Sequence, residues 1–168
     1  RLTEITETYL RFARLPRPKL EREDLGAIVT GVLEDARAEL AQAGIALELE
    51  VAPGLPDVAA DEAQLRQALL NLVRNAREAM SDRPGGRLRV AVEAAGTAEV
   101  RVTVRDSGAG IPPENLEKIF DPFFSTKERG TGLGLALVQQ IVVEHGVRID
   151  VESAPDAGTT FSLTFPAM

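Results

Sequence analysis

The sequence predicts an α+β fold, a two-layer sandwich in which three helices cover one face of a mixed β-sheet. Apolar residues recur at three- and four-residue intervals in three long segments, and several short segments alternate apolar and polar residues. The two kinds of segment are interleaved along the chain, as such a sandwich requires. With 168 residues and 44% hydrophobic composition, the chain suits one domain with a short extension.

The first 20 residues differ from the rest of the chain. They hold five basic and two acidic residues (+3), against 14 basic and 24 acidic (−10) in residues 21–168. Apolar residues at helical spacing run from Leu2 to Leu15, and prolines then end the helix. The chain begins without a start methionine, so we expect a fragment, with a helical stub and linker over 1–20 and the main domain over 21–168.

Two aspartates are predicted to cap helices. Asp24 and Asp61 each precede a segment of helical periodicity, where a carboxylate can accept the free N–H groups of the first turn. The predicted helices are 25–43, 62–80 and 133–145. The predicted strands are 45–51, 88–93, 100–106, 148–152 and 160–165, with a short extended piece at Val58. The long segment 107–130 has no regular period, which is typical of a functional loop.

Composition excludes several kinds of site. There is no cysteine, which excludes disulfides and thiolate metal sites, and His145 is the only histidine. The net charge of −7 and the 4% aromatic content argue against a nucleic-acid surface. No apolar run exceeds four residues, so we expect neither a membrane span nor direct membrane contact, and we expect this part of the protein to lie in the cytoplasm.

Asn71, Asn75 and Glu78 lie on one side of the second predicted helix, next to its apolar face. Amide oxygens are hard, neutral ligands that suit Mg²⁺, which takes much of its charge neutralisation from substrate phosphates. Standing alone, the two asparagines are more simply explained as surface residues bonded to water.

Two glycine-rich segments follow. Asp106 ends a strand, and the absent side chains of Gly108 and Gly110 would let a flat ring lie against the backbone while the carboxylate accepts from an amino group. At 127–135, glycines open directly into a helix, whose free N–H groups form an anion site. Three side chains could add donors there: Lys127, Arg129 and Thr131. Alone, the first segment is equally a plain turn and the second a flexible hinge.

Taken together with the run 119–127 and the turn at 156–161, these segments resemble a family. In chain order they are similar to the N, G1, F, G2 and final GT boxes of the ATP-binding domain of sensor histidine kinases, which have the Bergerat ATP-binding fold (GHKL). The resemblance covers about residues 22–166. The wording of the boxes, such as the helix segment 71–80, is most similar to the nitrogen-regulator type of histidine kinase.

The resemblance implies a role for each box. Asn75 would coordinate the Mg²⁺ of Mg-ATP, and Asn71 would help to hold phosphate and metal. Asp106 would bond the adenine amino group in a pocket shaped by Gly108 and Gly110, and residues 111–130 would be a mobile ATP lid. The other implied contacts to ATP are made by Lys127, Gly130, Thr131, Gly132, Leu133, Gly134, Leu135 and Thr160.

One position departs from the family pattern. Many members carry Lys or Arg three residues after the second asparagine, where it meets a phosphate, but this chain has Glu78 there. Candidates for the missing cation are therefore Lys127, Arg129 and Arg77.

The resemblance implies a protein histidine kinase of a two-component system, an enzyme that transfers the γ-phosphoryl of Mg-ATP to a histidine. The helix ending at Leu15 resembles the last part of the dimerisation and phosphotransfer domain, so the acceptor histidine is expected upstream of Arg1 and is not His145. The implied partners are ATP or ADP, that phosphotransfer domain and, through the longer protein, a response regulator, whether or not the longer protein is anchored in a membrane.

Two other functions remain as alternatives. The first is a GHKL-type ATPase, but such enzymes carry a glutamate as the general base where this chain has Asn71, and an amide cannot take a proton. The second is a regulatory module that binds nucleotide without transferring phosphate, which the unusual Glu78 would suit.

Overall fold

Five strands form one mixed sheet in the part of the chain that the computed structural model describes, residues 15–125 and 132–168. Their order across the sheet is β2 (Ala46–Val51), β4 (Arg87–Ala94), β5 (Glu99–Asp106), β7 (Thr159–Pro166) and β6 (Arg148–Ser153). Only β2 and β4 pair in parallel, and the other neighbours are antiparallel. A parallel pair needs a crossover connection, and a helix supplies it here.

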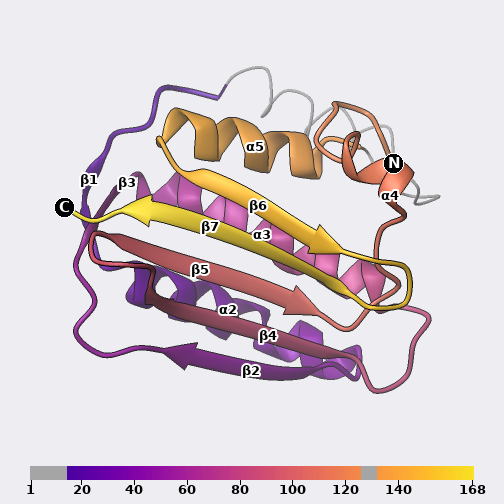
Figure 1. The fold of residues 1–168 in the computed structure, drawn as a ribbon. Coiled ribbons are helices and arrows are strands. Elements are labelled where there is room, and N and C mark those ends of the chain that lie inside the picture. The colour runs from indigo at the N-terminus through magenta and orange to yellow at the C-terminus, as the bar shows by residue number, and fades with distance from the viewer. Residues whose placement is uncertain (1–14, 126–131) are drawn as a thin grey trace.

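Three helices cover one face of this sheet, which is the predicted two-layer arrangement. They are α2 (Leu25–Gln42), α3 (Glu62–Ala79) and α5 (Gly134–Glu144), and Figure 1 shows α2 and α3 behind the strands and α5 above β6. Alternate strand residues face them and form the core, for example Val100, Val102 and Val104 on β5. The opposite face carries the intervening polar residues, and none of the described helices covers it (Figure 1). None of the helices in the described ranges is long and apolar enough to cross a membrane.

Capping aspartates begin α2 and α3 as expected. The Asp24 carboxylate accepts a hydrogen bond of 3.1 Å from Ala27 N–H, and that of Asp61 accepts one of 3.2 Å from Gln64 N–H. Glycine at position 44 follows α2 with a φ of +73°, a conformation that favours glycine. These local signals fix where two of the helices begin and where one ends.

Helices α3 and α5 lie side by side and antiparallel, with α3 between α5 and α2. The end of α5 is tied to the start of α3, because Asp61 N–H donates to His145 Nε2 at 3.0 Å. At the other end, Gly134 begins α5 beside Asn71, which lies midway along α3. The two helices therefore span the domain together.

The three helices and five sheet strands predicted between residues 25 and 165 are confirmed, with two additions. A one-turn helix, α4 (Pro113–Leu116), lies in the segment expected to lack regular structure. A second sheet pairs β1 (Glu21–Glu23) with β3 (Val58–Ala60), directly after the predicted linker. The helix predicted before Pro16 lies outside the described residues, apart from Leu15.

The packing of α5 can be tested with two valines on opposite sides of it. Val138 is 0% exposed and Val143 is 66% exposed. Val138→Ala removes two buried methyl groups and should lower the free energy of unfolding by about 2 kcal/mol. Val143→Ala, the matched control, should change it by less than about 0.5 kcal/mol, since only helix propensity is altered. Urea unfolding curves measure both values. Equal losses would contradict this orientation of α5.

Candidate active site

The asparagine pair predicted from the sequence lies on α3, near the start of α5. Asn71 Nδ2 donates to the Gln67 carbonyl at 3.1 Å, which fixes the amide. Its oxygen then faces α5, because a Cβ placed on Gly134 would lie 3.6 Å from Asn71 Oδ1. Asn75 is one turn further along α3 and partly buried. The structure thus brings the asparagine pair next to Gly134 of the second glycine-rich segment.

The start of α5 has the features of an anion site. The residue at its N-cap is Leu133, which cannot cap the first-turn N–H groups with its side chain. Leu137 N–H is bonded to the Leu133 carbonyl at 2.9 Å, so the N–H groups before it precede the regular helix bonding. The first-turn N–H groups, which have no acceptor within the helix itself, and the helix dipole together favour an anion there. The neighbouring amide oxygens of α3 could hold a cation that accompanies it.

Asp106 ends β5 on the core face of the sheet. Its side chain is buried, and Oδ1 accepts a hydrogen bond of 2.8 Å from Gly108 N–H. This bond holds the carboxylate in one orientation. A carboxylate has acceptor positions beyond one such bond, so it can also receive an amino group of a ligand.

Three glycines allow the backbone to close tightly around Asp106. A Cβ on Gly108 would lie 2.5 Å from the Ala79 carbonyl oxygen at the end of α3. Gly110 has no room for a Cβ against Ala154, and Gly158 has none against the Asp106 carbonyl, and both have positive φ. Gly108 and Gly110 were expected to shape an adenine pocket. Their immediate contacts are with the end of α3 and the β6–β7 turn.

The predicted role of Thr160, on the last strand β7, has to be corrected. Thr160 was expected to contact the adenine side of ATP, where Asp106 lies. However, Thr160 pairs with Arg105 on β5, and the side chain of Arg105 is exposed on the opposite face of the sheet from Asp106. Thr159 is the residue opposite Asp106, and both are buried. Because side chains alternate along a strand, only Thr159 shares the face of Asp106. The sequence reading missed it because the two threonines are adjacent and the register decides between them.

A hydroxyl network holds Thr159 in place. Its Oγ1 lies 2.8 Å from Ser153 Oγ, which donates to the Gly158 carbonyl at 3.0 Å and accepts from Ile111 N–H at 2.8 Å. Since the serine proton goes to Gly158, Thr159 is the donor in the first bond. Its own acceptor positions remain for a ligand or a water beside Asp106.

The predicted lid is described only in part. Gly132 has a φ of +74° and no room for a Cβ against Phe123, whose N–H donates to the Gly132 carbonyl at 2.7 Å. Leu133 is fully buried and Leu135 partly buried against the core, so their side chains belong to the packing of α5. Four predicted site residues and candidate cations lie outside the described residues: Lys127, Arg129, Gly130 and Thr131.

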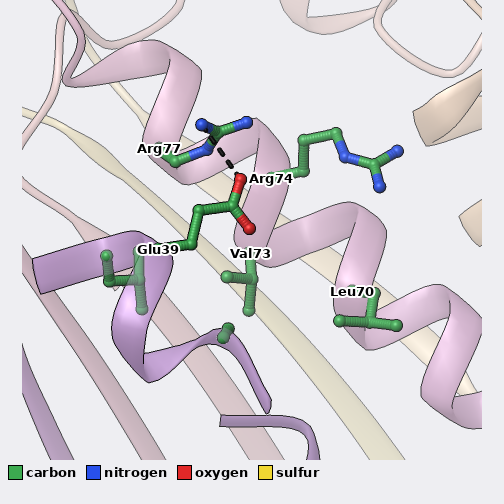
Figure 2. A pocket seen from close by; sticks show the side chains of 7 residues that line it. Glu39, Leu70, Val73, Arg74 and Arg77 are labelled. Atoms are coloured by element: carbon green, nitrogen blue, oxygen red, sulfur yellow. Dashed lines mark ion pairs between the residues drawn. The ribbon is translucent and has the colours of Figure 1, made fainter. Parts of the chain in front are cut away.

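Arg77, one of the predicted phosphate cations, is held on another side of α3. Figure 2 shows its guanidinium pointing at Glu39 of α2, and the two form an ion pair of 3.0 Å. The pair borders a small hollow of about 40 Å³ between α2 and α3. Glu78, at the position where the family carries a cation, is exposed on α3.

A larger groove, of about 350 Å³, lies on the outer face of the sheet at the end of β5. It is lined by Glu48, Arg87, Arg89, Arg105, Asp106, Ser107, Asp156 and Ala157. Arg87 donates to Glu48 at 2.6 Å, and this bond lowers the pKa of the Glu48 carboxyl below its usual range. Asp106 belongs to this groove as well as to the site just described, so the groove borders that end of the site, whereas Asn71 and Thr159 do not line it.

Comparison with known proteins shows which family this chain resembles. A family model described as histidine kinase-, DNA gyrase B-, and HSP90-like ATPase matches residues 60–168. The sensor histidine kinase ZraS of Klebsiella oxytoca is 41% identical over 166 residues, which is 99% of this chain and 36% of that protein. The sensory histidine kinase/phosphatase NtrB of Rhizobium leguminosarum bv. phaseoli is 41% identical over 145 residues, covering 76% of this chain and 38% of that protein.

This chain is also similar to solved structures of histidine kinases. Full-length ShkA in complex with AMPPNP has a TM-score of 0.87 and 29% identity, over 99% of this chain and 36% of that one. The histidine kinase ThkA in complex with the response regulator TrrA has a TM-score of 0.83 and 30% identity, over 99% and 47%. This chain spans just over a third of the length of the curated relatives ZraS and NtrB. It belongs to the family of histidine kinase-, DNA gyrase B- and HSP90-like ATPases.

Proposed function

We propose that this chain binds Mg-ATP and, as the catalytic part of a longer sensor histidine kinase, transfers the γ-phosphoryl group to a histidine of a phosphotransfer domain. The observation that carries the proposal is the meeting of the Asn71 amide oxygen with the start of α5. That place offers backbone donors for phosphate oxygens beside neutral amide oxygens that suit a magnesium ion.

The adenine end of the site would be Asp106 and Thr159. The buried carboxylate, oriented by Gly108 N–H, would accept the adenine amino group, and the Thr159 hydroxyl would bond the ring or a bridging water. A guanine presents a carbonyl oxygen at the corresponding position, which a carboxylate would repel. The site would therefore select ATP over GTP.

Magnesium fits the residues on α3. The structure describes no group of three or more His, Cys, Asp and Glu side chains that could hold a metal. Asn75, with Asn71 one turn before it, supplies hard neutral oxygens of the kind that Mg²⁺ accepts alongside substrate phosphates and water. When bound, the ion would neutralise phosphate charge, while the two amides and the start of α5 orient the phosphates.

The transfer itself requires positioning more than acid–base chemistry from this chain. The attacking histidine is its own nucleophile, so the protein must align it with the γ-phosphorus and stabilise the charge on the phosphoryl oxygens. Asn71 cannot accept a proton from water, which argues against ATP hydrolysis at this position. The proposed partners are ATP, the phosphotransfer domain and the response regulator that the longer protein serves.

Transfer can be tested by mixing the chain with Mg-ATP and a separately made phosphotransfer domain from the same protein. We expect phosphate to appear on that domain in an acid-labile, base-stable form, as phosphohistidine. Steady release of inorganic phosphate without the domain would instead support an ATPase. Nucleotide binding with neither product would support a regulatory module.

Asp106→Asn tests adenine recognition. The amide keeps one oxygen but presents an NH₂ group where the carboxylate accepted, so ATP should bind roughly 10- to 100-fold more weakly. The preference for ATP over GTP should fall, because the new NH₂ can donate to a guanine carbonyl. Titration calorimetry with both nucleotides measures this, and Asp150→Asn, on the exposed strand β6, is the control. Unchanged ATP affinity would disprove the adenine site.

Asn75→Ala tests the magnesium ligand. Loss of the amide oxygen should weaken binding of Mg-ATP roughly tenfold while metal-free ATP, measured with EDTA, changes by less than about twofold. The same variant without metal is thus its own control. An equal loss in both conditions would mean that Asn75 contacts the nucleotide or supports the fold, and does not serve the metal.

A further inference from the structure

Asp61 connects the linker to α3. Its carboxylate Oδ1 accepts from Gln64 N–H at 3.2 Å and so caps the helix, while Oδ2 accepts from Lys19 N–H at 3.0 Å. Lys19 is 42 residues away in the sequence and belongs to the predicted linker. The two oxygens of one carboxylate thus join the start of α3 to the linker.

His145 holds Asp61 from the other side. Its ring is buried, with Nδ1 2.8 Å from the Ile141 carbonyl, so Nδ1 carries the proton and donates it. Nε2 is then an acceptor, and Asp61 N–H donates to it at 3.0 Å. The only histidine of the chain therefore fixes the backbone of Asp61 from the last turn of α5.

Gln64 adds a second bond between α3 and the linker. Its side chain is 6% exposed, and Nε2 donates to the Pro16 carbonyl at 2.8 Å. After Lys19 the chain continues into β1, which pairs with β3 immediately before Asp61. Residues 16–23 therefore contact the start of α3 at Pro16 and Lys19, and then the strand that precedes α3. We call the set Asp61, Gln64 and His145 the linker clasp.

Both helices of the linker clasp reach the proposed ATP site with their other parts. Helix α5 runs from Gly134, beside Asn71, to the residue before His145. Helix α3 runs from the clasp to Ala79, against which Gly108 packs. A displacement of the linker relative to these helices would thus change where anything attached before residue 16 lies relative to the phosphates.

We propose that Asp61, held by His145, is a positioning residue for phosphoryl transfer: it ties the linker to the two helices of the ATP site and so sets where the preceding phosphotransfer domain meets the γ-phosphoryl group. This inference rests on the proposed function. Burial acts to raise the pKa of Asp61, but the N–H groups of Lys19 and Gln64 prevail and hold it below its usual range. The carboxylate is thus ionised, and accepts both bonds, at neutral pH.

Asp61→Asn separates the two bonds of this carboxylate. An amide has one acceptor oxygen, so it can cap α3 about as well as aspartate but cannot also accept from Lys19 N–H. In the full-length protein, transfer to the acceptor histidine should slow about tenfold while the affinity for an ATP analogue changes by less than about twofold. The Lys19 amide should also exchange its hydrogen faster.

Asp24→Asn is the matched control, because Asp24 caps α2 through Ala27 N–H and, among the described residues, bonds to no part of the linker. It should leave transfer and Lys19 exchange unchanged. At position 145, His145→Leu should slow transfer as Asp61→Asn does. His145→Gln should restore it, since the glutamine oxygen can accept where Nε2 did.

Each result supports or overturns the inference. The inference would be overturned if the Asp61→Asn variant transferred phosphate as fast as an active wild type. It would also be overturned if hydrogen exchange at the Lys19 amide were unchanged in that variant. An equal loss in Asp24→Asn would assign the effect to helix capping, and a parallel loss of nucleotide affinity would assign it to the fold. If the wild type binds ATP but never phosphorylates the histidine, the proposed function fails and the positioning role fails with it.

Discussion

The close approach of three backbone segments at the end of β5 is the constraint on which the site depends. The end of α3, the loop after Asp106 and the β6–β7 turn meet there with no room for Cβ atoms at Gly108, Gly110 or Gly158. Asp106 is buried at this junction and oriented by a backbone N–H. Any side chain at these glycines would force apart elements that belong to both the sheet and the helical layer. The orientation of the Asp106 carboxylate therefore depends on the same close packing that holds the two layers together.

The antiparallel helices α3 and α5 connect two parts of the domain, the proposed phosphate site and the contacts with the linker. At one end, the Asn71 amide oxygen faces the start of α5, where phosphates would lie. At the other, His145, Asp61 and Gln64 hold the linker and the start of α3 through directed hydrogen bonds. Because both ends share the same two helices, the nucleotide and the attached domain would be positioned by a common rigid element. This arrangement suits a reaction whose main requirement is alignment.

Local patterns predicted most of the fold and the identity of the motifs, because helix periodicity, strand alternation and capping residues act within a few positions. The Asp24 and Asp61 caps and the strand ending at Asp106 are of this kind. Contacts between distant segments were not predictable in this way. Strand register decided between Thr159 and Thr160, the pairing of β1 with β3 joins separate parts of the chain, and Arg77 is engaged by Glu39 of another helix.

An acidic domain that binds a polyanion such as ATP needs local rather than overall attraction. Residues 21–168 carry 14 basic and 24 acidic side chains, and Glu78 replaces the cation common in the family. At physiological salt, charges beyond about 8 Å are largely screened, so the net charge weighs less than the groups in contact with the phosphates. In the proposed site these groups would be neutral amides on α3 and backbone N–H groups at the start of α5. Among the described residues, neutralisation of the phosphates would then depend on the proposed metal ion and the helix terminus, which makes the metal dependence of binding an informative property of this site.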